Sequence, residues 1–116
     1  MKHIRTGDKR GAFNVLESTH LAQVAKMTLR PGAASDSHPS NEHPKSEQWL
    51  FVVSGTGEAI VHDRSGKSHR TKLQPNSLLV IERDELHQIK NTGRRQLATI
   101  NIYVPPAYDR EGEAKK

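Results

Sequence analysis

Turn-forming residues interrupt this chain at short intervals, and this spacing limits what the chain can fold into. Glycine, proline or asparagine recurs about every 8–12 residues, and few stretches between them repeat apolar residues with a helical period. The intervening segments predict eight short strands, at residues 12–17, 21–29, 48–53, 57–62, 68–73, 77–81, 87–90 and 96–104. Strands at this spacing are typical of an all-β sandwich or a small closed barrel.

The alternation of side chains indicates which strand faces are apolar. Residues 48–53 carry large apolar side chains on both faces, and residues 78–81 repeat the pattern. A barrel formed by one chain needs only its inner face to be apolar. We therefore expect a partner or the chain's own terminal arm to cover the outer face, and predict a homodimer.

The length of 116 residues is enough for one domain with one core. We expect a single domain over residues 1–116, made of an N-terminal arm (1–10), a barrel (11–106) and a charged C-terminal tail (107–116). The tail is short of apolar residues and has no period, so we expect it to be frayed or laid on the surface.

The composition excludes several classes of site and partner. The chain has no cysteine, so any metal must be held by nitrogen and oxygen, and nothing points to an oxidising compartment. The longest apolar run, at 49–53, is far shorter than the roughly 20 residues of a membrane span. The formal charge of +5 is spread along the chain with few aromatic residues, which argues against nucleic acid as a partner. We expect a cytoplasmic protein that binds neither membrane nor nucleic acid.

Potential metal ligands fall into two clusters. His38, His43 and Gln48 lie before and at the start of one predicted strand, and His87 lies in a second cluster about 40 residues further on. Imidazole nitrogen and side-chain oxygen are donors that Fe, Mn, Ni and Zn accept. Two strands of one small barrel can bring such distant residues together.

The spacing around the first cluster is ordered. Gly32 is followed by five residues and then His38, His43 by four residues and then Gln48, and Gln48 by six residues and then Gly55. The second cluster runs from Asn76 through Glu82 and Asp84 to His87 and Asn91, where three residues separate His87 from Asn91.

These two clusters resemble the two conserved motifs of the cupin superfamily, and the resemblance covers roughly residues 24–106. It implies a double-stranded β-helix, that is, a jelly-roll-type barrel, and one divalent transition metal held by His38, His43, Gln48 and His87. Fe, Mn, Ni and Zn remain open as the metal. It also implies a small-molecule ligand or substrate in the barrel.

The chain departs from the family pattern at several positions. Four residues separate the two histidines where the family has one, so either His38 or Asn41 could occupy the first ligand position. Gln48 replaces the family's glutamate, and the spacing also allows Glu47 as the ligand, although alternation favours Gln48. In the second motif Asn76 and Asp84 replace glycines, and both residue types tolerate left-handed backbone angles.

Other polar residues are given plainer interpretations. The histidines at positions 3, 20, 62 and 69 are expected at the surface, and Glu58 and the 82–85 turn are expected to be solvated rims without a catalytic role. Thr99, Asn101 and Tyr103 share one face of the last strand, and the sequence leaves open whether that face points into the barrel.

Two functions from different classes follow. The first is a small metal-binding enzyme, a dioxygenase or an isomerase acting on a small oxygenated compound. The second is a binding module that senses a sugar or an acid without chemistry, with or without metal. The weak amide ligand and the long first motif favour the second, while an apolar pocket with convergent polar groups fits both.

Overall fold

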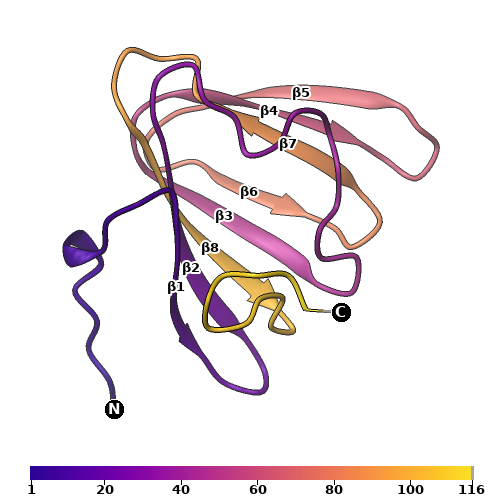
Figure 1. Ribbon diagram of the computed structural model, residues 1–116. Coiled ribbons are helices and arrows are strands. Elements are labelled where there is room, and N and C mark those ends of the chain that lie inside the picture. The colour runs from indigo at the N-terminus through magenta and orange to yellow at the C-terminus, as the bar shows by residue number, and fades with distance from the viewer. Residues whose placement is uncertain (116) are drawn as a thin grey trace.

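The computed structural model describes residues 1–115, and these fold into eight strands and one short helix (Figure 1). The elements are η1 (Thr6–Asp8), β1 (Phe13–Ser18), β2 (Gln23–Leu29), β3 (Glu47–Ser54), β4 (Gly57–His62), β5 (Ser68–Leu73), β6 (Leu78–Ile81), β7 (Leu86–Lys90) and β8 (Leu97–Val104). All eight predicted strands are present. The second begins at Gln23, later than expected, because the Thr19 hydroxyl accepts hydrogen bonds from the N–H groups of Leu21 and Ala22 and closes a turn there.

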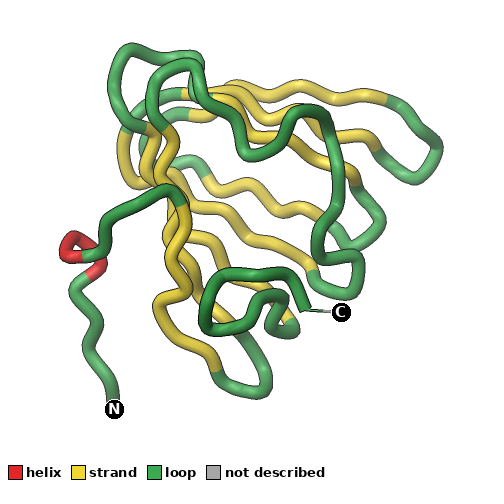
Figure 2. Tube along the Cα trace, viewed as in Figure 1, coloured by secondary structure: helices red, strands yellow, loops and turns green. Residues whose placement is uncertain are grey.

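The strands form two antiparallel sheets that face each other, which confirms the predicted all-β, jelly-roll-type barrel. One sheet has the order β1-β2-β8-β3-β6 and the other has the order β5-β4-β7. Figure 2 shows the two layers of strands and the loops that close one end of the space between them. The described residues contain no helix that is long and apolar enough to cross a membrane.

The core lies between the sheets and is apolar at one end. Its buried members are Leu29, Leu50, Val52, Ala59, Leu73, Ile89 and Leu97. Truncating one of the leucines to alanine would cost about 2–5 kcal/mol, because the rigid sheets cannot collapse into the space left behind. Towards the other end of the same inner faces, polar side chains replace apolar ones, and Thr99, Asn101 and Tyr103 all point inward.

Turn residues set the strand connections. Gly55 has a φ of 88°, and a side chain there would collide with the backbone of Gln96 and Leu97, so this position requires glycine. Asn76 takes a left-handed φ of 71°, as its residue type permits, while Asp84 does not take a left-handed φ. The side chain of Asn91 donates to the carbonyl groups of Leu29 and Arg95 and holds two loops together.

The loop between β2 and β3 and the tail line the open end of the barrel. The loop between β2 and β3 runs beside β7 and forms bridges from Ala34 to Lys90 and from Ser40 to His87. After β8 the chain folds back on itself, and Tyr108 forms a bridge with Ala114. The expectation of a frayed or superficial tail is wrong at its start, because Ala107 and Tyr108 are buried.

One glutamine explains why the tail is ordered. The side chain of Gln23 is buried; its amide oxygen accepts hydrogen bonds from the N–H groups of Ala107 and Tyr108, and its amide nitrogen donates to the Tyr108 carbonyl. These bonds satisfy backbone groups that would otherwise be unpaired at the end of the barrel. The tail segment 105–115 is therefore part of the fold.

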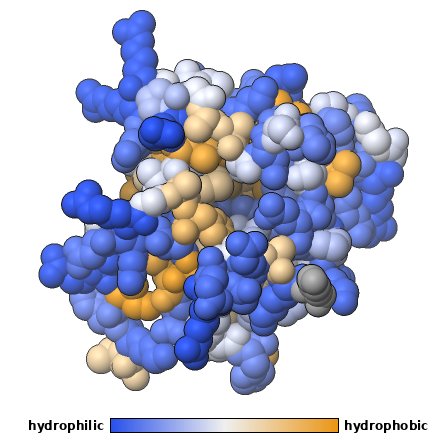
Figure 3. Space-filling model, in the orientation of Figure 1, coloured by the Kyte–Doolittle hydropathy of each residue, from blue (hydrophilic) through white to orange (hydrophobic). Residues whose placement is uncertain are grey.

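The outer face of the large sheet stays apolar and exposed. Trp49 pairs with Val80 on β6 and Ile102 on β8, and Phe51 lies opposite Leu78. The residues with exposed apolar side chains on this face are Trp49, Phe51, Val53, Leu78, Val80, Ile102 and Val104. We call them the outer apolar face. Figure 3 shows a different side of the molecule, where apolar atoms lie inside a hollow and hydrophilic residues surround it.

Candidate metal and ligand site

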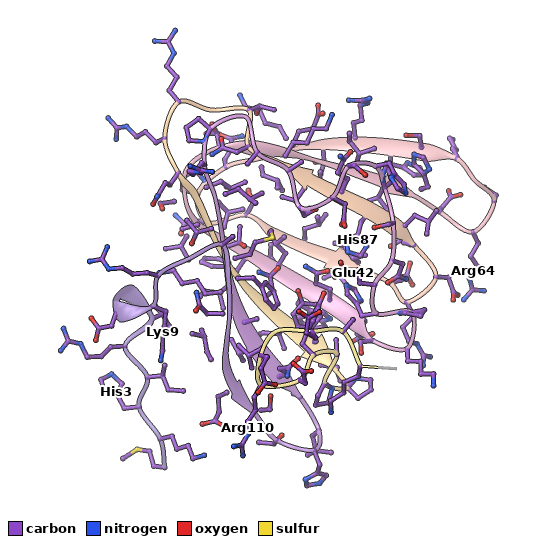
Figure 4. The ribbon with its side chains drawn as sticks, in the orientation of Figure 1. His3, Lys9, Glu42, Arg64, His87 and Arg110 are labelled. Atoms are coloured by element: carbon purple, nitrogen blue, oxygen red, sulfur yellow. The ribbon has the colours of Figure 1, made fainter. Side chains whose placement is uncertain are left out.

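A cavity of about 270 Å³ opens at the polar end of the barrel. Strand β3 contributes Gln48, β7 contributes His87 and β8 contributes Tyr103, while His43 comes from the loop just before β3. The antiparallel register pairs Gln48 with Tyr103 and places Asn101 diagonally across from Gln48, so β3 and β8 bring their polar groups close together. Figure 4 shows His87 and Glu42 in the opening between the sheets.

The two histidines lie together and are buried. His43 is 5% exposed and His87 is 7% exposed, and their ring centroids are 4.9 Å apart. In each ring the Nδ1 atom faces a backbone carbonyl: Ser46 at 3.2 Å from His43, and Glu85 at 3.3 Å from His87. A neutral ring that donates from Nδ1 keeps a lone pair on Nε2, the arrangement that metal-binding histidines commonly have.

Gln48 completes the group and is oriented by a chain of hydrogen bonds. Its Oε1 lies 2.9 Å from Nε2 of His43, and its Nε2 donates to Oδ1 of Asn101 at 2.8 Å. The Asn101 amide donates in turn to the Thr99 hydroxyl, which donates to the Met27 carbonyl, both at 3.0 Å. The chain directs the amide oxygen of Gln48 to Nε2 of His43. The two atoms form a hydrogen bond when the ring proton is on Nε2, and both are acceptors when it is on Nδ1. A cation between them would satisfy both.

The structure distinguishes between the two candidate residues at the start of β3. Gln48 is buried and faces the cavity, while Glu47 faces outward and accepts a hydrogen bond from the Trp49 indole at 3.1 Å. The alternation expected from the sequence therefore places Gln48 inside. Its role as a ligand stays a prediction.

The structure does not bring His38 to the other predicted ligands. Its side chain is exposed, and its Nδ1 lies 3.0 Å from the hydroxyl of the neighbouring Ser37. Asn41 is also engaged elsewhere, because its amide donates to the Arg83 carbonyl and its oxygen accepts from the His43 N–H. The physical reason is the longer loop, which the bridge between Ser40 and His87 holds beside β7. Neither alternative for the first ligand position is met in this structure.

Several lining residues were not predicted. Asp36 and Glu42 line the cavity from the β2–β3 loop, and Tyr108 lines it from the tail. The Tyr108 hydroxyl donates to the Glu42 carboxylate at 3.3 Å, and the Tyr108 ring packs on Tyr103 and Phe13 with centroid distances of 5.0 and 4.8 Å. The only sequence signal for Tyr108 was an aromatic residue in an otherwise charged tail.

Burial fixes the protonation of the lining groups. Desolvation, and then repulsion from His43, lowers the pKa of His87 from 6.5 to about 4, so this ring is neutral at physiological pH. Burial raises the pKa of Tyr103 and of Tyr108 well above the ordinary value of 10.0, and the Glu42 charge raises that of Tyr108 further. Both phenols therefore stay protonated.

The donor set fits a divalent transition metal in type, because two neutral imidazoles and one amide oxygen are donors such ions accept. It offers no charge to offset that of the ion, and the described residues contain no group of three or more histidine, aspartate or glutamate side chains placed to hold a metal. A metal here would be held by His43, His87 and Gln48, and its remaining coordination positions would be free for a ligand.

Comparisons with known proteins point to one family. The sequence profile of the cupin domain family matches residues 25–103. A search of curated proteins finds no significant match.

The solved structures that resemble the chain share this fold. BH2720 from Bacillus halodurans has a TM-score of 0.79 and 23% identity over 95% of this chain and 80% of its own. KdgF from Halomonas sp. has a TM-score of 0.65 and 19% identity over 81% and 77%. Oxalate decarboxylase from Lactobacillus farciminis, solved as a formate complex, has a TM-score of 0.74 and 23% identity, but this chain covers only 31% of it. At these identities the likeness shows the fold.

Proposed function

This chain belongs to the cupin domain family, and on that premise we propose that it binds one divalent transition metal through His43, Gln48 and His87 and holds a small oxygenated molecule beside it. The observation that carries the proposal is the orientation of the donors. Both histidines have Nδ1 against a backbone carbonyl, and Gln48 turns its oxygen towards the Nε2 of His43. A related fold, the oxalate decarboxylase of Bacillus subtilis, is described with Mn(II) centres, which supports a divalent ion of this kind.

The metal would act as a Lewis acid towards the oxygen atoms of the ligand. The protein's own groups supply the rest. His87 is neutral and needs no deprotonation before it binds. The phenol of Tyr103 remains protonated and can donate a hydrogen bond to a ligand oxygen, whereas that of Tyr108 already donates to Glu42. Leu29 and Ile89 add apolar side chains to the cavity lining. Within this proposal the reaction is that of a dioxygenase or an isomerase.

Elemental analysis of the untagged protein, purified without chelator, tests the metal site. We expect about one equivalent of Fe, Mn, Ni or Zn per chain and its loss in the His43→Ala, His87→Ala double variant. His20→Ala is the matched control, because this histidine is exposed and lies outside the cavity. Absence of metal from the wild type, even after incubation with each of the four ions, would rule out this part of the proposal.

A second candidate function is a binding cupin that senses a sugar or an acid without chemistry. One observation favours it: an amide replaces the family's carboxylate, and neither His38 nor Asn41 reaches the cavity, so the metal would be weakly held. Turnover of a candidate substrate by the wild type, abolished in His87→Ala while circular dichroism and thermal unfolding show a folded chain, would favour the enzyme. Saturable binding without turnover would favour the sensor.

We propose that the partner which covers the outer apolar face is a second copy of this chain. The face is continuous over β6, β3 and β8, and its largest members, Trp49 and Phe51, are 40% and 39% exposed. Light scattering after gel filtration should give the mass of two chains. Phe51→Lys should give one chain, because a lysine buried without a partner is costly. A monomeric wild type would contradict the proposal.

The cytoplasmic location expected from the sequence belongs to the same proposal. It is supported by the absence of cysteine from the chain. Fractionation of cells that produce the protein naturally should recover it with cytosolic markers. Recovery with envelope markers would refute the cytoplasmic location.

A further inference from the structure

The charges at the mouth of the cavity are opposite in sign to those of the molecule as a whole. The chain has a formal net charge of +5. Yet none of the lysine and arginine residues among positions 1–115 lines this cavity, while two carboxylates, Asp36 and Glu42, do. The mouth therefore has a negative electrostatic character on a positively charged protein.

Both carboxylates act on the same point in the cavity. Glu42 accepts a hydrogen bond from the Tyr108 hydroxyl, and its charge raises the pKa of Tyr108, after the larger effect of burial. Asp36 raises the same pKa, by a smaller amount. The fields of two residues that are six positions apart in the loop thus converge on the Tyr108 hydroxyl.

Aromatic rings line the cavity beside these carboxylates. The Tyr108 ring contacts the rings of both Phe13 and Tyr103. The His43 ring packs edge-on against Tyr103 at a centroid distance of 5.0 Å. All of them are among the cavity-lining residues. The faces of aromatic rings carry negative potential and attract cations, most strongly where water is excluded.

We propose that the mouth of this cavity selects ligands that carry an ammonium group, held by Asp36 and Glu42 and by the aromatic rings beside them. The inference rests on the proposed function in taking this cavity as the ligand site. Carboxylate ligands are usually bound through arginine or lysine, and the lining offers neither. An oxygen-bearing end of the same ligand could still reach His43 and His87, so a small amino acid or amino alcohol suits the whole cavity.

Three compounds of nearly the same shape and different charge test the inference. Choline is cationic, 3,3-dimethylbutan-1-ol is its neutral analogue, and 3,3-dimethylbutanoate is an anion. Dissociation constants would be measured by NMR titration, followed at the backbone amides of Tyr103 and Tyr108, on the protein as purified and after chelation. At low salt and after chelation we expect choline to bind about tenfold more tightly than the alcohol, and the anion to bind most weakly. In metal-containing protein the charge of the ion opposes that of choline, so the preference should be smaller.

Charge-neutralising variants identify the groups responsible. Glu42→Gln keeps an acceptor for Tyr108, and the preference for choline over the alcohol should fall in it and disappear in the Asp36→Asn, Glu42→Gln double variant. Glu58→Gln is the matched control. Glu58 lies on β4 outside the cavity lining, and its carboxylate pairs with Arg70 on β5. Equal binding of choline and the alcohol by the chelated protein, or a preference that survives in the double variant, would overturn the inference.

The metal content of the same samples separates this inference from the proposed function. Neither carboxylate belongs to the group of His43, Gln48 and His87, so the double variant should keep the metal content of the wild type. If metal is bound and choline is not preferred, only the inference fails. If choline is preferred and no metal is ever bound, only the metal site fails.

Discussion

The two ends of the cavity are built in different ways. At the deep end, His87, Gln48 and Asn101 project from the strands β7, β3 and β8, and the inter-strand hydrogen bonds fix their depth. At the mouth, Asp36 and Glu42 come from the β2–β3 loop and Tyr108 comes from the tail segment 105–115. The deep end is therefore as stable as the barrel, whereas the mouth depends on a few contacts of segments that can open without unfolding the barrel.

The largest difference is expected for Asn101→Leu at the deep end. The change removes the acceptor of the Gln48 amide and the donor to Thr99, and no water can replace them in a fully buried site. We expect the free energy of unfolding to fall by about 2–3 kcal/mol and metal affinity to fall by about 10- to 100-fold. Urea unfolding and a metal titration measure the two effects. Thr71→Val, at an exposed position of β5, is the control, and unchanged stability in Asn101→Leu would show that the polar chain is dispensable.

A pH titration examines the deep end without loss of a side-chain contact. The pKa of His87 is about 4 in the folded protein and near 6.5 when unfolded, so the unfolded state takes up the proton more readily. The stability that the protein has while His87 is neutral in both states is fully present above the pKa of 6.5 in the unfolded chain, and it declines as the pH falls towards 4. We expect a loss of about 2 kcal/mol between about pH 7.5 and about pH 5 in metal-free protein.

The measurement is the difference in unfolding free energy between wild type and His87→Asn at each pH. The variant cannot titrate at this position, so its stability should depend less steeply on pH over this range. Parallel curves for the two proteins would mean that His87 is not neutral in the fold at pH 5. Chelation beforehand keeps metal loss from contributing to the slope.

Gln23→Leu should have a smaller effect on stability, because it acts at the mouth. The leucine removes the hydrogen bonds to the buried Ala107 and Tyr108, but the tail segment can move away from the barrel and expose the released backbone groups to water. We expect a loss of about 1 kcal/mol and fast hydrogen exchange at the Ala107 and Tyr108 amides, with unchanged metal content. Leu21→Ala, at an exposed neighbouring position, is the control. Loss of metal in Gln23→Leu would show that the two ends are coupled.

The difference between the deep end, which is built from strands, and the mouth, which is built from a loop and the tail, explains how much of the molecule could be predicted from sequence. Strand positions and the inward orientation of Gln48 follow from local alternation and turn chemistry, which are properties of neighbouring residues. The path of the β2–β3 loop depends on its bridges to β7, and the tail depends on Gln23, 85 residues before Tyr108. No local pattern reports such contacts, so His38 was expected in the cavity, and Glu42 and Tyr108 were not.

The face of β8 was left open for a related reason. Either face of β8 could be buried, because one carries the apolar Ala98, Ile100 and Ile102 and the other carries the partly apolar Tyr103. The pairing with β2 and β3 decides the matter, since it places Thr99 and Asn101 beside inward-facing residues of both neighbours. Register between strands that are distant in sequence is not encoded in either strand alone.

The smallest change in unfolding free energy is expected at Glu42, which belongs to the mouth although the next residue, His43, belongs to the deep end. Glu42 is exposed at the mouth, and His43 is buried with ring contacts to Tyr103 and His87. Glu42→Gln should change the free energy of unfolding by less than about 0.5 kcal/mol, because an exposed side chain that keeps its acceptor loses little. His43→Gln should cost about 1–3 kcal/mol, because it leaves buried polar groups without partners. Equal costs in urea unfolding would show that the mouth is as much a part of the barrel as the deep end.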